Sequence, residues 1–121
     1  MVVRLKGITI DTIEDAEAKR LRVLKMTSKA DGVTITLELP EALCGGMRAK
    51  DSVDVVIDGE PIAKGDSAKL YAEGTVFKIN DGPQYEMIGT IGGLRLTLSI
   101  SSPTPSQKKT FESNQFFLML D

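Results

Sequence analysis

The sequence predicts an all-β chain that folds as one small antiparallel barrel of about eight strands. Val, Ile and Thr, which branch at Cβ and favour pleated strands, make up 28 of the 121 residues. Apolar and polar residues alternate in short runs, separated by turn residues at intervals of about 8–12 residues, as in all-β domains. Glycines inside two of these runs mark bends of the kind that a barrel needs to close.

Two runs alternate strictly between apolar and polar residues. Residues 33–39 (VTITLEL) place only Val, Ile and Leu on one face, and the run ends at Pro40. Residues 94–100 (LRLTLSI) repeat the pattern and end before Pro103. Alternation with period two is typical of a strand with one buried face, so both runs are predicted to be strands.

Six further strands are expected. The first covers residues 2–13 and changes phase at Gly7, which is how a bulge or bend looks in a sequence. Residues 21–26 change phase between Val23 and Leu24. The remaining strands are expected at residues 52–58, at 70–79 with Gly74 in the middle, at 85–91 and at 115–120.

The connections contain turn chemistry and little helix. Asn80-Asp81-Gly82-Pro83 between two strand patterns is the best hairpin signal. Only residues 14–19 and 41–46 could form short helices, and the polar, Pro-containing segment 101–110 is expected to be a long mobile loop. Residues 1–121 therefore form one domain with an OB-fold-like barrel, for which a β-sandwich is the alternative.

Composition excludes most catalytic chemistry. The chain has no His, so it cannot build a Ser-His-Asp or Cys-His centre. The single cysteine, Cys44, excludes an internal disulfide and a thiolate zinc site. A reducing, cytoplasmic compartment fits this cysteine usage.

The sequence also lacks membrane and export signals. No stretch of about 18 apolar residues is present, and the first residues, MVVRLKGITID, lack the basic head and apolar core of a secretory signal. We therefore expect a cytoplasmic protein without a membrane partner. The chain has only 5 Asn and Gln residues, a feature of proteins from thermophiles.

A basic strand is the candidate nucleic-acid site. Small barrels of this type bind single strands with aromatic platforms and a basic groove, and Arg20, Arg22 and Lys25 could line such a groove. However, the chain has six aromatic residues, no Trp and a net charge of -2, whereas phosphate binding usually needs clustered cations. A solvated strand face, or a contact with an acidic partner, is the preferred interpretation.

Other possible sites lack the required spacing. Asp51, Asp54 and Asp58 have oxygen ligands suited to Mg²⁺ or Ca²⁺, but no DxDxDG loop with a distal Glu accompanies them. The Gly45-Gly46 and Gly92-Gly93 pairs do not belong to phosphate-binding motifs. We therefore expect no metal, no cofactor, no small-molecule substrate and no catalytic constellation, and we interpret Cys44 as a buried or idle thiol.

One stretch resembles a known family. The run from Leu70 to Ile79 (LYAEGTVFKI), then Tyr85, then Ile91-Gly92-Gly93-Leu94 and the final FFLML are similar, in order and spacing, to the small OB-fold subunit of archaeal and eukaryotic DNA-directed RNA polymerases. This is the subunit 8 family, which includes the archaeal counterpart of that subunit. The first half of the chain matches it more loosely. The short connection between residues 59 and 68 resembles archaeal members more than eukaryotic ones.

The resemblance implies a non-catalytic accessory subunit that packs against the largest polymerase subunit. On this hypothesis, exposed sheet edges pair with a partner segment, and the paired glycines let a partner backbone approach. Nucleic-acid contact would be weak or indirect. The alternatives are a free-standing single-stranded nucleic-acid-binding protein and, with less support, a metal-dependent enzyme that uses Asp or Glu. The residues expected to contact the partner are Gly74, Val76, Phe77, Tyr85, Ile91, Gly92, Gly93 and Leu94.

Overall fold

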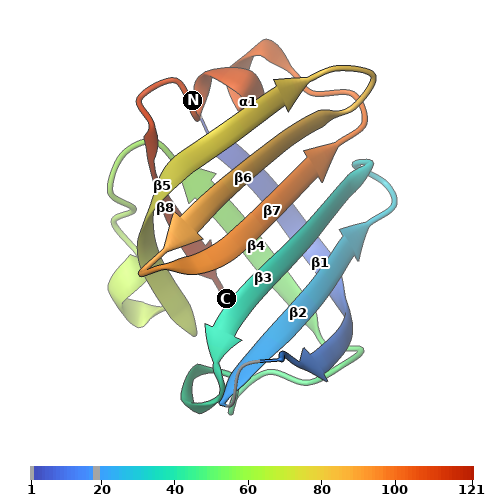
Figure 1. Cartoon of the computed structure of the whole chain (residues 1–121), viewed down its shortest axis with the longest axis vertical. Helices are drawn as coiled ribbons and strands as arrows, with labels where there is room; N and C mark the ends of the chain where they lie inside the picture. The colour runs from blue at the N-terminus through green and yellow to red at the C-terminus, as the bar shows by residue number, and fades with distance from the viewer. Residues whose placement is uncertain (1, 18–19) are drawn as a thin grey trace.

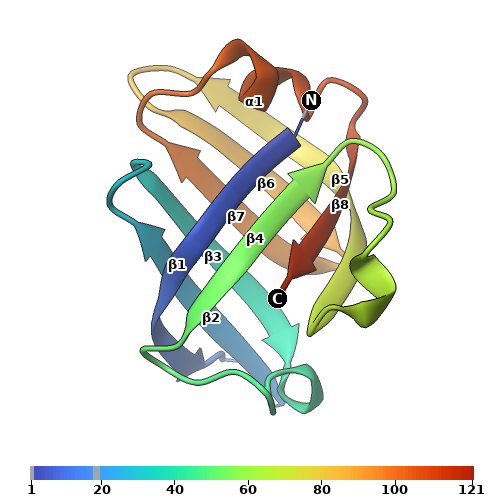
Figure 2. The same ribbon diagram turned by 180° about the vertical axis from the view of Figure 1, so that it is seen from behind.

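A computed structural model describes residues 2–17 and 20–121 as eight strands in one closed antiparallel barrel (Figures 1 and 2). The strands are β1 (Val2–Asp15), β2 (Leu21–Ser28), β3 (Val33–Pro40), β4 (Ser52–Asp58), β5 (Leu70–Asp81), β6 (Tyr85–Ile91), β7 (Leu94–Ile100) and β8 (Gln115–Leu120). Around the barrel their order is β1-β2-β3-β7-β6-β5-β8-β4, and β4 pairs with β1 to close the ring. The predicted all-β barrel of eight strands is confirmed.

The two halves of the chain share one topology. In each half three consecutive strands form a meander, and the fourth returns to pair with the first, so that β4 pairs with β1 and β8 pairs with β5. The halves join through the pairs β3–β7 and β4–β8. As a result, β1 and β5 occupy equivalent places, and each is a long strand that changes its pairing partner partway along its length.

The barrel interior is filled by alternating aliphatic side chains and three rings. Phe111 packs between Tyr85 and Phe116, with ring centroids 6.4 and 6.2 Å away. Phe116 in turn fits where β5 and β6 carry glycine. A Cβ atom at Gly74 would lie 2.4 Å from Phe116 Cζ, and one at Gly89 would lie 2.7 Å from Phe116 Cε1. These two glycines therefore make room for a large ring in the core.

Bulges interrupt the long strands. The pairing of β1 with β4 shifts register between Leu5 and Ile8, where Gly7 has a φ of +64°, so the predicted bend at this glycine is confirmed. In β5 the register shifts between Val76 and Lys78, two residues beyond the glycine that marked the expected bend. β2 keeps an unbroken register with β3, so the bend expected within residues 21–26 is absent from that pairing.

The helical segments are short. A single 3₁₀ turn at Glu41–Leu43 lies within the expected segment 41–46, and a second covers Gly65–Ser67. The helix expected at 14–19 is wrong where the structure describes it, because residues 14 and 15 continue β1; residues 18–19 lie outside the described chain. No helix in the described ranges 2–17 and 20–121 has the length and apolar character needed to cross a bilayer.

The segment 101–110, which the sequence predicts to be a loop, contains the helix α1 (Pro105–Lys109). Thr104 accepts a hydrogen bond from the Gln107 backbone N–H at 3.1 Å, and its own N–H donates to the Gln107 side chain at 2.9 Å. Pro105 occupies the first turn, where proline is favoured. This capping box provides hydrogen-bond acceptors for the N–H groups of Thr104 and Gln107 at the start of the helix. The prolines in this segment predict a loop and do not reveal the helix.

Candidate protein-docking site

β5 extends beyond the strand that flanks it on one side. Residues 70–75 of β5 pair with β8, and residues 75–81 pair with β6. The Val76 N–H donates to the Asn114 carbonyl at 2.8 Å, which is the last backbone bond on the β8 side within residues 2–17 and 20–121. From residue 77 to residue 81 the strand has a backbone neighbour on the β6 side only (Figure 1). We call residues 77–81 the β5 edge.

The β5 edge exposes apolar side chains. Phe77 is the extra residue of the β5 bulge, and a bulge redirects the side chain that it carries. Its side chain is 75% exposed, and Ile79 is 40% exposed. Natural sheet edges usually carry charges or proline that prevent pairing with another chain. An unpaired edge with two exposed apolar residues is therefore a candidate site for a partner strand. It includes Phe77 from the predicted set, whereas Val76 is half-buried and its N–H is bonded to Asn114.

Two residues of the predicted set are instead part of the core. Gly74 is buried beneath the Phe116 ring, and Tyr85 is 3% exposed and stacks on Phe111. Burial raises the pKa of the Tyr85 hydroxyl, and the charges of nearby carboxylates add to the rise. The expectation that these two residues contact a partner is therefore corrected. Both lie on the inward phase of their strands, which the sequence pattern did not separate from the outward phase.

The predicted glycine pair forms the turn between β6 and β7. Gly92 and Gly93 have φ values of +56° and +84°, as a tight two-residue hairpin turn requires. Both are exposed, and a Cβ atom at either position would meet no other atom within 4 Å. Ile91 and Leu94 flank the turn and are half-buried. This turn lies at the end of β6 that is remote from the β5–β6 hairpin, so it is separate from the β5 edge (Figure 1).

The basic residues do not form one stripe. Arg22 lies on the same phase of β2 as buried Leu24 and Met26, whereas Lys25 points to the outer face. Arg20 is exposed in the turn before β2, with a φ of +66°. In a regular extended strand, Arg20 and Arg22 would project to the same side. The structure places Arg20 in the turn before β2 instead, so the expected basic stripe is not formed.

Two of these cations are already paired with acids. Arg22 contacts Asp15 at 2.8 Å and Glu41 at 3.2 Å, and Lys25 contacts Glu14 at 3.3 Å. These acids lower the positive potential that a phosphate backbone would meet. The interpretation of this region as a solvated, charged strand face is therefore better supported than a nucleic-acid groove.

The acidic residues and the thiol have local structural roles. The carboxylates of Asp51, Asp54 and Asp58 each accept a hydrogen bond from a backbone N–H of a nearby turn or bulge. No group of three or more potential metal ligands gathers within the described ranges. The Cys44 thiol donates to the Pro40 carbonyl at 3.6 Å, and burial raises its pKa.

Searches against family models and curated proteins found no match to this chain. The geometry alone therefore identifies the β5 edge. One sequence signal could have indicated it: the strand expected at residues 70–79 is longer than the one expected at residues 115–120, which cannot cover its full length. The alternation pattern gives strand lengths but not pairing partners, so the unpaired side of β5 was not predicted.

Proposed function

We propose that this chain is a non-catalytic accessory subunit of an archaeal multisubunit DNA-directed RNA polymerase in the cytoplasm, and that it docks on the largest subunit through the β5 edge. The observation that carries the proposal is Phe77, which is 75% exposed on a strand edge with no pairing partner in the described chain. The resemblance of residues 70–96 to the small OB-fold polymerase subunit supplies the identity of the partner.

Strand addition explains how this edge would bind. A partner segment that lies beside residues 77–81 completes their main-chain hydrogen bonds, and its side chains cover Phe77 and Ile79. Burying the exposed part of the Phe77 ring contributes about 2 kcal/mol, which corresponds to about a 30-fold change in affinity. Of the other edge residues, Lys78 is exposed, and Asp81 is paired with Lys108 at 3.1 Å.

The test is assembly of the polymerase from recombinant subunits. We expect the wild-type chain to elute with the largest subunit in size-exclusion chromatography. The Phe77→Asp variant should lose this association, because an ionised carboxylate cannot be buried without a partner. Circular dichroism should show an unchanged fold, since Phe77 makes little contact with the core.

The matched control is Thr12→Asp. Thr12 occupies the equivalent part of β1 and is also exposed, so this variant introduces the same charge on the other long strand. It should assemble like the wild type. Normal assembly of the Phe77→Asp variant would overturn the proposal, as would a wild-type chain that fails to bind the largest subunit. Tight, salt-sensitive binding of a single-stranded oligonucleotide by the isolated chain would favour a nucleic-acid function instead.

A further inference from the structure

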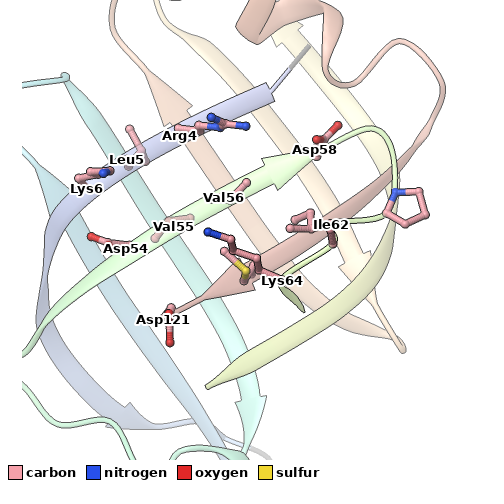
Figure 3. A pocket seen from close by; sticks show the side chains of 13 residues that line it. Arg4, Leu5, Lys6, Asp54, Val55, Val56, Asp58, Ile62, Lys64 and Asp121 are labelled. Carbon is pink, nitrogen blue, oxygen red and sulfur yellow. The ribbon is translucent and has the colours of Figure 1, made fainter. Parts of the chain in front are cut away.

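A groove of about 470 Å³ lies on the outside of the barrel, between the strands β1, β4 and β8 and the loop that follows β4 (Figure 3). Its floor is a row of neighbouring residues on these strands, since Arg4 pairs with Val56 and Val56 pairs with Met119. Pro61 and Ile62 from the loop form the facing wall. This surface is on the opposite side of the barrel from the β5–β6–β7 meander (Figures 1 and 2).

The loop wall is held in place by Tyr71 on β5. The Ile62 N–H donates to the Tyr71 hydroxyl at 3.0 Å. Gly65 lies against the same ring, where a Cβ atom would come within 2.5 Å of ring carbons. The other neighbour of Tyr71 is the stacked ring of Phe117, with centroids 6.2 Å apart. These contacts fix the loop relative to the sheet, so the groove is formed before any ligand arrives.

Free cations border the apolar floor. Arg4, Lys6 and Lys64 make no ion pair within residues 2–17 and 20–121. Arg4 and Lys64 lie on either side of Val56 (Figure 3). The carboxylate of Asp54 lies at one end of the groove and accepts a hydrogen bond from the Gly7 N–H at 2.9 Å.

At the other end the Asp58 carboxylate accepts a hydrogen bond from the Glu60 N–H at 3.1 Å. Asp121 also lines the groove and is joined to Asp54 by two backbone hydrogen bonds. The acids therefore gather at the ends of the groove, with Lys6 beside Asp54, and Arg4 and Lys64 flank its middle (Figure 3).

We propose that this groove binds an extended segment of a partner protein in which a short apolar stretch with one large side chain is flanked by carboxylates. The apolar side chain would lie on Val56 and Met119, and the carboxylates would meet Arg4 and Lys64. A peptide fits better than a small molecule because the groove is open along one side, whereas small-molecule sites enclose most of their ligand. The groove is distinct from the β5 edge, so this inference does not depend on the proposed polymerase partner.

The test uses nuclear magnetic resonance of the full chain titrated with the peptide acetyl-Glu-Leu-Phe-Glu-amide. We expect concentration-dependent shifts of the methyl groups of Val56, Ile62 and Met119 and of the Arg4 amide. The variant Lys64→Glu should weaken the affinity by at least about tenfold, because one attractive charge becomes repulsive. Added salt should weaken binding to the wild type, since the groove is open to solvent.

Two controls separate the groove from general surface charge. Lys78→Glu makes the same charge change on the β5 edge and should leave peptide binding unchanged. The peptide acetyl-Lys-Leu-Phe-Lys-amide should bind at least about tenfold more weakly than the acidic peptide.

Equal binding of the acidic and basic peptides would overturn the proposal, as would shifts confined to the β5 edge or the absence of any shift. Glutamate that binds as well as the acidic peptide would also overturn it, because the apolar floor would then have no role. Spectra of each variant before titration show whether the fold is intact.

Discussion

The long strands β1 and β5 hold equivalent places in the two halves of the barrel, but the ends that extend beyond the neighbouring strand expose different side chains. Each strand has a bulge at the corresponding position, where the extra residue is Asp11 in β1 and Phe77 in β5. Each strand then continues past the barrel wall with a neighbour on one side only. The β1 extension exposes carboxylates, and the β5 extension exposes an aromatic ring and an isoleucine together with Lys78 and Asp81.

The difference lies in how many contacts each extension makes within the chain. Asp11 accepts a hydrogen bond from the Thr27 hydroxyl at 2.5 Å, and the two acids that follow it, Glu14 and Asp15, form ion pairs with β2. The β5 edge forms one ion pair with the rest of the described chain (residues 2–17 and 20–121), between Asp81 and Lys108. Charges protect an edge from pairing with other chains, so the paired carboxylates of the β1 extension disfavour the addition of a strand there. The exposed apolar side chains of Phe77 and Ile79 leave the β5 edge less protected.

The largest expected effect is a difference in the loss of stability when a glycine is replaced in β5 and in β1. Gly74→Ala should destabilise the protein by about 3 kcal/mol, because its Cβ atom would overlap the buried Phe116 ring. Gly7→Ala on β1 should cost only about 1–2 kcal/mol, because its Cβ atom meets nothing closer than Ser52 Oγ at 3.5 Å and only the positive φ is strained. Urea unfolding of both variants measures the difference; equal costs would contradict this account of Phe116.

The next effect concerns the contacts that protect β1. Arg22→Ala should reduce the free energy of unfolding by about 1 kcal/mol, because one guanidinium serves both Asp15 and Glu41 at the surface. Lys108→Ala in the second half should cost about 0.5 kcal/mol or less, since it breaks a single exposed pair. High salt should reduce both effects. A larger loss for Lys108→Ala than for Arg22→Ala would reverse the comparison.

A smaller effect on stability distinguishes the two bulge residues. Phe77→Ser should change the free energy of unfolding by less than about 0.5 kcal/mol, because the ring makes few contacts that folding creates. Asp11→Ser should cost somewhat more, up to about 1 kcal/mol, because Thr27 loses its acceptor. Denaturant midpoints of the two variants test this order. A strongly destabilised Phe77→Ser variant would mean that the ring packs against the barrel.

The smallest effect appears at alkaline pH. Burial raises the pKa of Tyr85, so the native state keeps the phenol proton at a pH where the unfolded chain, with a tyrosine pKa of about 10, has lost it. Stability is therefore complete below pH 10 and falls as the pH rises further. Tyr85→Phe should flatten this fall relative to the wild type in unfolding measurements between about pH 9 and pH 11. Identical slopes would show that Tyr85 does not ionise in that range.

The strands and the bend that the structure confirmed could be predicted from residues that are close together in the sequence. Strict alternation in 33–39 and 94–100 identified two strands, and the phase change at Gly7 identified a bend, because each depends on residues that are adjacent in the chain. The composition likewise indicated one barrel without regard to which strands pair. The helix α1 was missed although Thr104 and Gln107 carry its capping signal, since the prolines around them indicated a loop.

The sequence by itself determined that the chain forms short strands around an apolar interior, since side-chain branching and alternation act within each segment. Only the tertiary structure decided which glycines face Phe116, which cations are paired with acids and which strand edge stays unpaired. Each of these depends on residues from different strands, which come together only when β1 pairs with β2 and β5 pairs with β8. For that reason Tyr85 belongs to the core, while Phe77, eight residues earlier, is exposed to solvent.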